Sequence, residues 1–207
     1  MTLIQALDLI GTLVFAISGT LAGIQKRLDM FGALFTGFIT ALGGGTTRDL
    51  LLGNYPLAWV GHPYYILIIL LGYTLAFTFT GWMLRLRNAF FLFDTIGLGV
   101  FTLLGIQKAL ILNVHPIIAV MMGTLSAVFG GALRDLFTTE IPHIFRKEIY
   151  AVACLAGGGL FFLLREMQID IHYIEVTTVS FIIIVRMVAV RYKLGLPVPS
   201  QKEENLF

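Results

Sequence analysis

The sequence has little charge. Its 207 residues include 14 lysines and arginines and 12 aspartates and glutamates, which together make 13% of the chain. A soluble domain carries charge on about a quarter of its residues. Because so few charges cannot cover a surface in contact with water, the composition argues against a soluble enzyme. The mean hydropathy of +0.89 predicts a protein that lies in a membrane.

Cysteine is almost absent, and so are the sequence marks of enzymes. The one cysteine, Cys154, excludes an intramolecular disulfide and a thiolate metal cluster. The four histidines are far apart, and none pairs at the spacing of metal ligands. The chain has no phosphate-binding, dinucleotide-binding or serine-hydrolase motif, and no basic run typical of nucleic-acid binding. We therefore expect no enzyme activity, no cofactor, no bound metal and no nucleic-acid partner.

Long apolar stretches take the place of charge. A helix that crosses a bilayer needs about 20 mainly apolar residues. The stretches that qualify are residues 3–24, 30–52, 64–84, 90–111, 116–136, 149–164 and 172–190. The sequence therefore predicts an all-α integral membrane protein with seven transmembrane helices. They form a single membrane domain over residues 1–193, followed by a polar tail over 194–207.

The placement of lysine and arginine predicts the orientation of the chain, because cytoplasmic loops are enriched in both. One side of the predicted membrane holds Lys26, Arg27, Arg85, Arg87, Arg146, Lys147, Arg191, Lys193 and Lys202. The other side holds Lys108 and Arg165. We therefore expect a multi-pass protein of the bacterial inner membrane with its N-terminus outside and its C-terminus in the cytoplasm.

The sequence repeats itself at an offset of 86 residues. Between positions 8 and 56, 15 of 49 residues are identical to the residue 86 places later, with no gap. The matched pairs include Asp8 and Asp94, Phe15 and Phe101, Gly44 and Gly130, Gly45 and Gly131, Arg48 and Arg134, and Asp49 and Asp135. Each copy, about 3–84 and about 90–165, holds three spans, so the second copy enters the membrane from the opposite side. A seventh helix over 172–192 lies outside the repeat.

Inverted repeats of this kind are typical of transport proteins, whose pathway lies at the interface between the two copies. The alternative is that the duplication records ancestry alone. The matched positions are polar or glycine rather than merely apolar, which favours a transport pathway.

Glycines gather within the second and fifth spans. They are Gly43, Gly44 and Gly45, followed by Thr46, in the second span, and Gly130 and Gly131 in the fifth. Because a glycine inside a helix costs about 1 kcal/mol relative to alanine, these runs predict a break in both helices. A break within the membrane exposes backbone carbonyls that can line a pore. The alternative is close packing of two helices through small residues.

Six charged residues recur at matched positions within the spans: Asp8, Arg48, Asp49, Asp94, Arg134 and Asp135. A charge inside a membrane is costly and marks a functional site by default. Adjacent residues on a helix point about 100° apart, which disfavours pairing of each arginine with the aspartate that follows it. Depth instead predicts the ion pairs Asp8–Arg48 and Asp94–Arg134, one near each mouth of a pathway. The alternative is that both pairs are structural clamps.

With its seven spans, its repeat and the two motifs that begin at Gly43 and Gly130 and end in Arg-Asp, the chain resembles the bacterial branch of the trimeric intracellular cation (TRIC) channel family over residues 3–193. The resemblance implies a homotrimer in which each protomer has its own hydrophilic pore, bounded by the second and fifth helices. It also implies a potassium channel that passes other monovalent cations such as sodium.

Two other functions stay open. Some bacterial relatives are described as glycine transporters, and an arginine in the pathway would suit the carboxylate of an amino acid better than a cation. A trimer that senses lipids and carries no flux is the third reading. Basic residues near the predicted inner face would then contact anionic lipid headgroups; they are Arg85, Arg87, Arg186 and Arg191.

Overall fold

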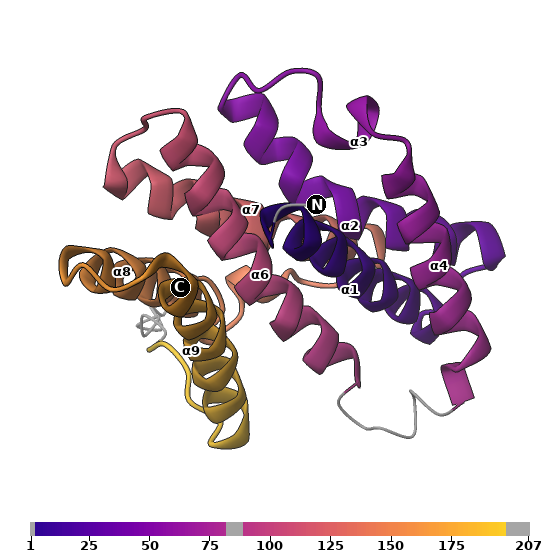
Figure 1. Cartoon of the computed structure of the whole chain (residues 1–207). Helices are drawn as coiled ribbons and strands as arrows, with labels where there is room; N and C mark the ends of the chain where they lie inside the picture. The colour runs from indigo at the N-terminus through magenta and orange to yellow at the C-terminus, as the bar shows by residue number, and fades with distance from the viewer. Residues whose placement is uncertain (1–2, 82–88, 198–207) are drawn as a thin grey trace, which may run out of the picture.

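The computed structural model describes residues 3–81 and 89–197, and its regular elements there are helices (Figure 1). In chain order they are α1 (Leu3–Gln25), α2 (Met30–Leu51), α3 (Ala58–Gly61), α4 (Tyr64–Thr78), α6 (Ala89–Ile111), α7 (Pro116–Phe137), the 3-10 turn η1 (His143–Phe145), α8 (Ala151–Glu166) and α9 (Ile171–Arg191). The helices α1, α2, α6 and α7 form the centre. α4 packs on α1, while α8 and α9 pack beside α6 and α7.

Local chemistry fixes where several helices begin. The Asp29 carboxylate accepts a hydrogen bond of 2.7 Å from the Gly32 N–H at the start of α2. Asp170 caps α9 in the same way. Pro116 opens α7, where its missing N–H leaves no helix bond unmade. These caps lie where the sequence predicts the spans to start, to within two residues.

The bounds of α1 and α2 recur in α6 and α7. α6 ends 86 residues after α1, and α7 begins and ends 86 residues after α2. The residues that follow these helices also match. Arg27 and Asn113 have φ of 57° and 55°, and Gly53 and Thr139 have φ of 64° and 57°. The offset of the sequence repeat is therefore also the offset of the elements.

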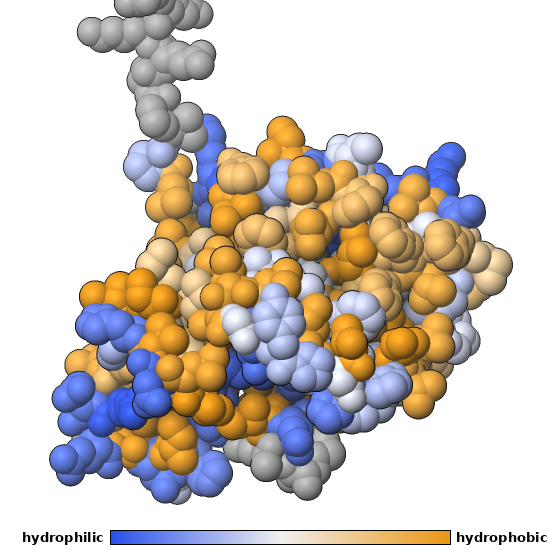
Figure 2. Space-filling model, turned by 90° about the horizontal axis from the view of Figure 1, so that it is seen from above, coloured by the Kyte–Doolittle hydropathy of each residue, from blue (hydrophilic) through white to orange (hydrophobic). Residues whose placement is uncertain are grey.

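The chain is an all-helical membrane protein. Among the described residues, α1, α6, α7 and α9 are each long and apolar enough to cross a bilayer. α2 has 22 residues, α4 has 15 and α8 has 16. Residues 82–84 of the third predicted span lie outside the described residues, so the total of seven spans stays a prediction. The face seen in Figure 2 is largely apolar, and Phe31, Leu67 and Phe145 are among the exposed side chains of the molecule.

The predicted unwinding of the second and fifth spans at their glycines is wrong. α2 and α7 are continuous α-helices through Gly43–Gly45 and through Gly130–Gly131. The glycines instead allow the two helices to pack closely. A Cβ added at Gly44 would overlap the carbonyl oxygen of Ser126, and one added at Gly130 would overlap that of Thr40. Close packing of α2 against α7 outweighs the intrinsic cost of glycine in each helix.

The contacts at the centre are reciprocal between the two copies. Phe15 stacks on its repeat mate Phe101, with ring centroids 5.0 Å apart. Gly97 leaves room for the Phe15 ring, and its mate Gly11 leaves room for Phe101. Reciprocal contact of this kind is what a two-fold axis between two similar units produces.

Candidate functional site

Two clusters of buried polar residues lie on either side of this centre. The first cluster is Asp8, Arg48, Asp49, Tyr65 and Lys108, and the second cluster is Asp94, Arg134, Asp135, Tyr150 and Arg186. Each holds two aspartates, an arginine, a tyrosine and one further cation. The six charged residues singled out from the sequence all lie in these clusters, three in each.

In the first cluster Arg48 pairs with its own neighbour. Its Nε donates to one Asp49 oxygen at 2.9 Å, and one Nη lies 2.8 Å from the same oxygen in an ion pair. The expectation that adjacent residues do not pair is therefore wrong. The Cβ atoms do point apart, but the arginine side chain is long enough to fold back over the helix surface. The second Asp49 oxygen accepts from the Ala58 N–H at 3.4 Å, at the start of α3.

Asp8 has partners other than the predicted one. The Tyr65 hydroxyl donates to Asp8 at 2.6 Å. The Lys108 ammonium lies 3.7 Å from Asp8 and 3.9 Å from Asp49, and so between the two carboxylates. Among the described residues Asp8 forms no ion pair with Arg48, and that prediction is wrong. Lys108, which comes from the end of α6 in the other copy, supplies the counter-charge instead.

In the second cluster the predicted pair is present. Arg134 donates to Asp94 at 2.5 Å and also holds Asp135 at 2.9 Å. The other oxygen of Asp135 accepts from the His143 N–H at 3.0 Å and lies 2.9 Å from its Nδ1. The guanidinium of Arg134 lies over the Phe90 ring, 4.4 Å from its centroid. One arginine thus joins α6, α7 and the η1 turn.

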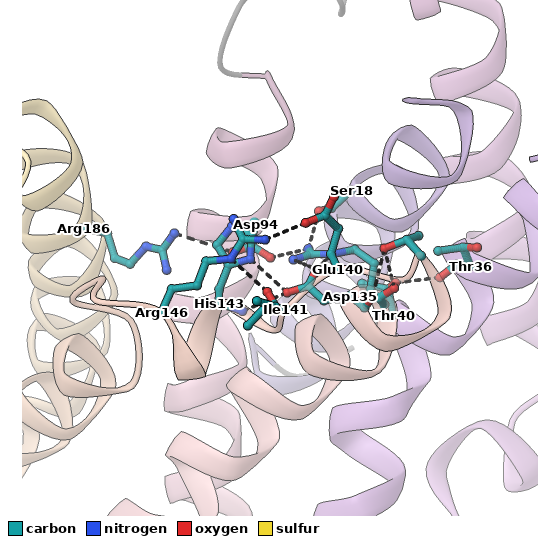
Figure 3. A network of polar contacts seen from close by, with 12 residues as sticks. Ser18, Thr36, Thr40, Asp94, Asp135, Glu140, Ile141, His143, Arg146 and Arg186 are labelled. Atoms are coloured by element: carbon teal, nitrogen blue, oxygen red, sulfur yellow. Dashed lines mark hydrogen bonds and ion pairs between the residues drawn. The ribbon is translucent and has the colours of Figure 1, made fainter. Parts of the chain in front are cut away.

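Arg186 approaches the same aspartate from α9, as Figure 3 shows. Its Nη lies 3.8 Å from Asp94, and the side chain is 1% exposed. The guanidinium lies over the rings of Tyr150, at 4.4 Å, and Phe91, at 5.0 Å. None of its nitrogens has a hydrogen-bond partner among the described residues. The predicted lipid contact of Arg186 is wrong, because the helix α9 turns this residue inward toward Asp94.

Each arginine also reaches across to the other copy of the repeat. Arg48 lies 3.4 Å from the Ser126 hydroxyl in α7, and Arg134 donates to the Ser18 hydroxyl in α1 at 3.1 Å. These bonds fix the arginine side chains at both ends of the central bundle. They also tie the two copies together through polar contacts.

The charges within each cluster balance. Two aspartates face Arg48 and Lys108 in the first cluster, and two face Arg134 and Arg186 in the second. All three arginines are at most 1% exposed. An isolated charge at such depth is strongly unfavourable, and pairing with hydrogen bonds offsets most of that cost. The pairs therefore hold the central helices together whatever else they do.

Water-sized space adjoins both clusters. A cavity of about 20 Å³, room for about one water molecule, is lined by Asp8, Arg48, Asp49 and Tyr65, and it reaches the inner Phe101 ring. Beyond the second cluster a hollow of about 270 Å³ is lined by Asp135, His143 and the ion-paired Glu140. The stack of Phe15 on Phe101 lies between the clusters, so the structure holds the interior tightly packed.

The remaining predicted residues have separate positions. Thr46 accepts a hydrogen bond from the Trp59 indole at 3.1 Å. A Cβ at Gly43 would press on Leu133 of α7, and one at Gly131 would press on the Tyr150 hydroxyl, whereas Gly45 faces Arg48 of its own helix. Arg191 is exposed, and its lipid contact stays a prediction. The predicted lipid contacts Arg85 and Arg87 lie outside the described residues.

The sequence did not assign Tyr65, Lys108 or Tyr150 to a site. The repeat aligns Tyr64 with Tyr150, but the structure gives the corresponding position to Tyr65, one residue further along. Lys108 and Arg186 have no charged mate at the offset of 86. Only a search for lysine and arginine side chains inside the predicted spans could have identified these two residues as members of the site.

Comparison with known proteins identifies relatives over most of the chain. The family model described as glycine transporter matches residues 5–81 and again residues 91–166, so its two matches begin 86 residues apart. The inner membrane protein YadS of Escherichia coli is 37% identical over 201 residues, which cover 94% of this chain and 95% of that protein. A membrane protein of Deinococcus radiodurans is 42% identical over 160 residues, 76% and 74% of the two chains.

Solved structures of similar fold are cation channels. The TRIC trimeric intracellular cation channel orthologue from Rhodobacter sphaeroides superposes with a TM-score of 0.88 at 33% identity, over 94% of this chain and all of that one. A prokaryotic TRIC channel solved in potassium chloride superposes with a TM-score of 0.84 at 30% identity, over 93% and 98%. The similarity covers the helices that hold both clusters.

Proposed function

Because the chain belongs to the TRIC family of bacterial membrane proteins, which the glycine-transporter family model also describes, we propose that it is a channel for monovalent cations, potassium foremost among them. The pathway runs within each protomer, from the first cluster through the central bundle of α1, α2, α6 and α7 to the second cluster. Sodium follows potassium through it. The protein assembles as a homotrimer and performs no chemical catalysis.

The charge balance of the two clusters is the observation that carries this proposal. An unpaired arginine in a narrow pathway would repel a cation strongly. Here Arg48 and Arg134 each bind an aspartate at 2.9 Å or closer, so their charge is cancelled locally. The second oxygen of Asp94, which lies 3.8 Å from Arg186, and the Asp8 carboxylate, which lies 3.7 Å from Lys108, are held less closely and can then attract a passing cation. The likeness to solved TRIC channels supports the same conclusion.

The same proposal includes the arrangement in the membrane. Seven spans form a three-plus-three inverted repeat followed by α9, and the reciprocal contacts of Phe15 with Phe101 support a two-fold axis between the copies. The protein lies in the bacterial inner membrane with its N-terminus outside and its C-terminus in the cytoplasm. Lipids and further copies of the chain surround it there.

Recordings from purified protein in planar bilayers test the channel. We expect discrete current steps in potassium chloride, and a reversal potential in a salt gradient that shows preference for potassium over chloride. The variant Asp94→Asn, which removes the negative charge that faces Arg134 and Arg186, should lower that preference. Current without cation preference in the wild type would contradict the proposal.

A glycine carrier is the second candidate, and one feature of the second cluster favours it. The Tyr150 hydroxyl and the Arg186 guanidinium are buried donors without hydrogen-bond partners among the described residues. Donors of this kind suit the carboxylate of a small zwitterion. Saturable uptake of labelled glycine by proteoliposomes that give no current would favour the carrier and exclude the channel.

A further inference from the structure

A groove remains at the C-terminal end of α9, and its lining includes no residue of either cluster. It lies between the segment that leads from η1 into α8 and the segment that follows α9, and has a volume of about 470 Å³. Its lining includes Lys147, Glu148 and Ile149 before α8, and Val190, Lys193 and Leu194 at the end of α9. Two distant parts of the chain therefore meet to form it.

Backbone contacts build the groove. The Leu196 N–H donates to the Lys147 carbonyl at 2.8 Å, and Glu148 pairs with Gly195 in an isolated antiparallel bridge. A Cβ at Gly195 would overlap the Lys147 carbonyl, so the close approach requires glycine. The walls are thus held by the main chain, which leaves the side chains of the two lysines free to bind.

The groove combines an apolar wall with positive charge. Ile149, Val190 and Leu194 supply apolar surface, while Lys147 and Lys193 are exposed. Neither lysine has an ion-pair or hydrogen-bond partner for its side chain within the part of the chain that the structure describes. Glu148 also lines the groove, and its negative charge partly opposes theirs.

The place of the groove along α9 fixes its depth in the membrane. α9 is a span of 21 residues, and the groove begins at its last turn. This is the level at which the hydrocarbon core ends and the lipid headgroups begin. A cationic pocket with apolar walls at this level matches a headgroup on one side and the start of its acyl chains on the other.

We propose that the groove binds one phospholipid with an anionic headgroup. The ammonium groups of Lys147 and Lys193 hold the phosphate, and the acyl chains run along Ile149 and Val190 toward the bilayer. A free phosphate has no use for the apolar wall, which is why the structure points to a lipid rather than a soluble anion. The proposal does not depend on whether the protein is a channel or a carrier.

Lipid retention by the full-length protein in detergent tests the site. Native mass spectrometry would compare phosphatidylglycerol with phosphatidylcholine of the same acyl chains. We expect the wild type to prefer phosphatidylglycerol, each of Lys147→Gln and Lys193→Gln to weaken its binding about fivefold, and the double variant about thirtyfold. Glu148→Gln should strengthen binding, because it removes the one negative side chain of the groove.

The control variant changes the net charge by the same amount elsewhere. Arg27→Gln with Arg165→Gln removes two exposed cations that do not line the groove, and it should leave the preference unchanged. An equal loss in this control would show a general effect of charge and overturn the site. So would unchanged lipid binding in the double lysine variant, or full displacement of the lipid by millimolar inorganic phosphate.

Discussion

At the scale of single residues, the central question is what the fixed cations do beside a cation pathway. Arg48 and Arg134 are bound on several sides, so they act as structural partners of the aspartates. Lys108 and Arg186 are different, because each lies 3.7–3.9 Å from carboxylate oxygens and is held less closely. These two residues are the ones whose removal changes the charge of a cluster without breaking its tightest bonds.

Replacing Arg186 with glutamine should increase cation flow. The change leaves Asp94 bound to Arg134 alone and gives the second cluster a net negative charge, which attracts potassium. We expect the unitary conductance in potassium chloride to rise about twofold or more. The matched control is Arg191→Gln, five residues along the same helix and exposed, which should leave the conductance unchanged. A lower conductance of a correctly assembled Arg186→Gln protein would contradict the assigned role.

Tyr65 should contribute to stability through its hydroxyl. Tyr65→Phe keeps the ring but removes the 2.6 Å hydrogen bond to the buried Asp8, which should lower the free energy of unfolding by about 1–2 kcal/mol. Tyr64→Phe is the control, since the Tyr64 side chain is 38% exposed and stacks on its neighbours through the ring. Thermal unfolding in detergent would compare the two variants. Equal stability of both would mean that the hydrogen bond adds nothing.

At the scale of helices, the glycine runs separate two explanations that the sequence leaves open. If the helix were broken here, replacing Gly44 or Gly45 would have the same effect, because either glycine would favour unwinding. If the glycines serve close packing, the two replacements have different effects. A Cβ at Gly44 meets the Ser126 carbonyl of α7, whereas a Cβ at Gly45 comes no closer than 3.7 Å to its neighbour, the Arg48 guanidinium.

Gly44→Ala and Gly130→Ala should each force α2 and α7 apart and destabilise the protein by about 1–3 kcal/mol or more. Gly45→Ala should instead be tolerated, or stabilise the helix by up to about 1 kcal/mol. Unfolding in detergent measures all three. If Gly45→Ala were as harmful as Gly44→Ala, the explanation by packing would fail.

An ion-pair bridge at the end of α1 should respond to pH. Glu140 binds Lys26 of the loop after α1 and Arg146 at 2.7 Å. The hydrogen bond from Lys26, followed by that from Arg146, lowers the pKa of Glu140 below its ordinary value. A lowered pKa means that the bridge stabilises the folded state at neutral pH. This stabilisation is lost as Glu140 becomes protonated, when the pH falls below about 4.

Glu140→Gln should therefore lower the unfolding temperature slightly at pH 7 and have a smaller effect at pH 4. The effect is small because both partners are about 40% exposed and water screens the pair. Unfolding temperatures of wild type and variant at the two pH values give the comparison. A difference that grows toward low pH would contradict the assignment.

The helices could be predicted from sequence far better than the contacts between them. Apolar length and caps such as Asp29 are local, so the spans lie within a few residues of the helices wherever the structure describes them. In the third span α4 ends at Thr78, and helical residues resume at Thr80. The partner of Asp8 was predicted wrongly because Lys108 reaches it only through tertiary packing. The glycine runs agree equally well with a break in the helix and with close packing of two helices, and only the position of α7 distinguishes these explanations.

At the scale of the whole molecule, the two copies of the repeat make a prediction about sidedness. Arg27 and Asn113 are repeat mates that follow α1 and α6, are exposed, and have φ of 57° and 55°. In an inverted repeat they lie on opposite sides of the membrane. The excess of lysine and arginine near Arg27 predicts that this residue lies in the cytoplasm and Asn113 outside.

Cysteine substitution at each mate tests both statements in one experiment. Cys154 is fully buried, so the wild-type chain gives a low background with a membrane-impermeant thiol reagent. Asn113→Cys should react in intact spheroplasts, and Arg27→Cys only in inverted vesicles. The two positions share one backbone conformation, so the strain of adding cysteine is the same in both variants. Reaction of both from one side would exclude the inverted repeat. If Arg27→Cys reacted in intact spheroplasts and Asn113→Cys only in inverted vesicles, the inverted repeat would stand and the predicted orientation would be wrong. The repeat predicts only that the two residues lie on opposite sides, whereas the excess of lysine and arginine predicts which side is the cytoplasm.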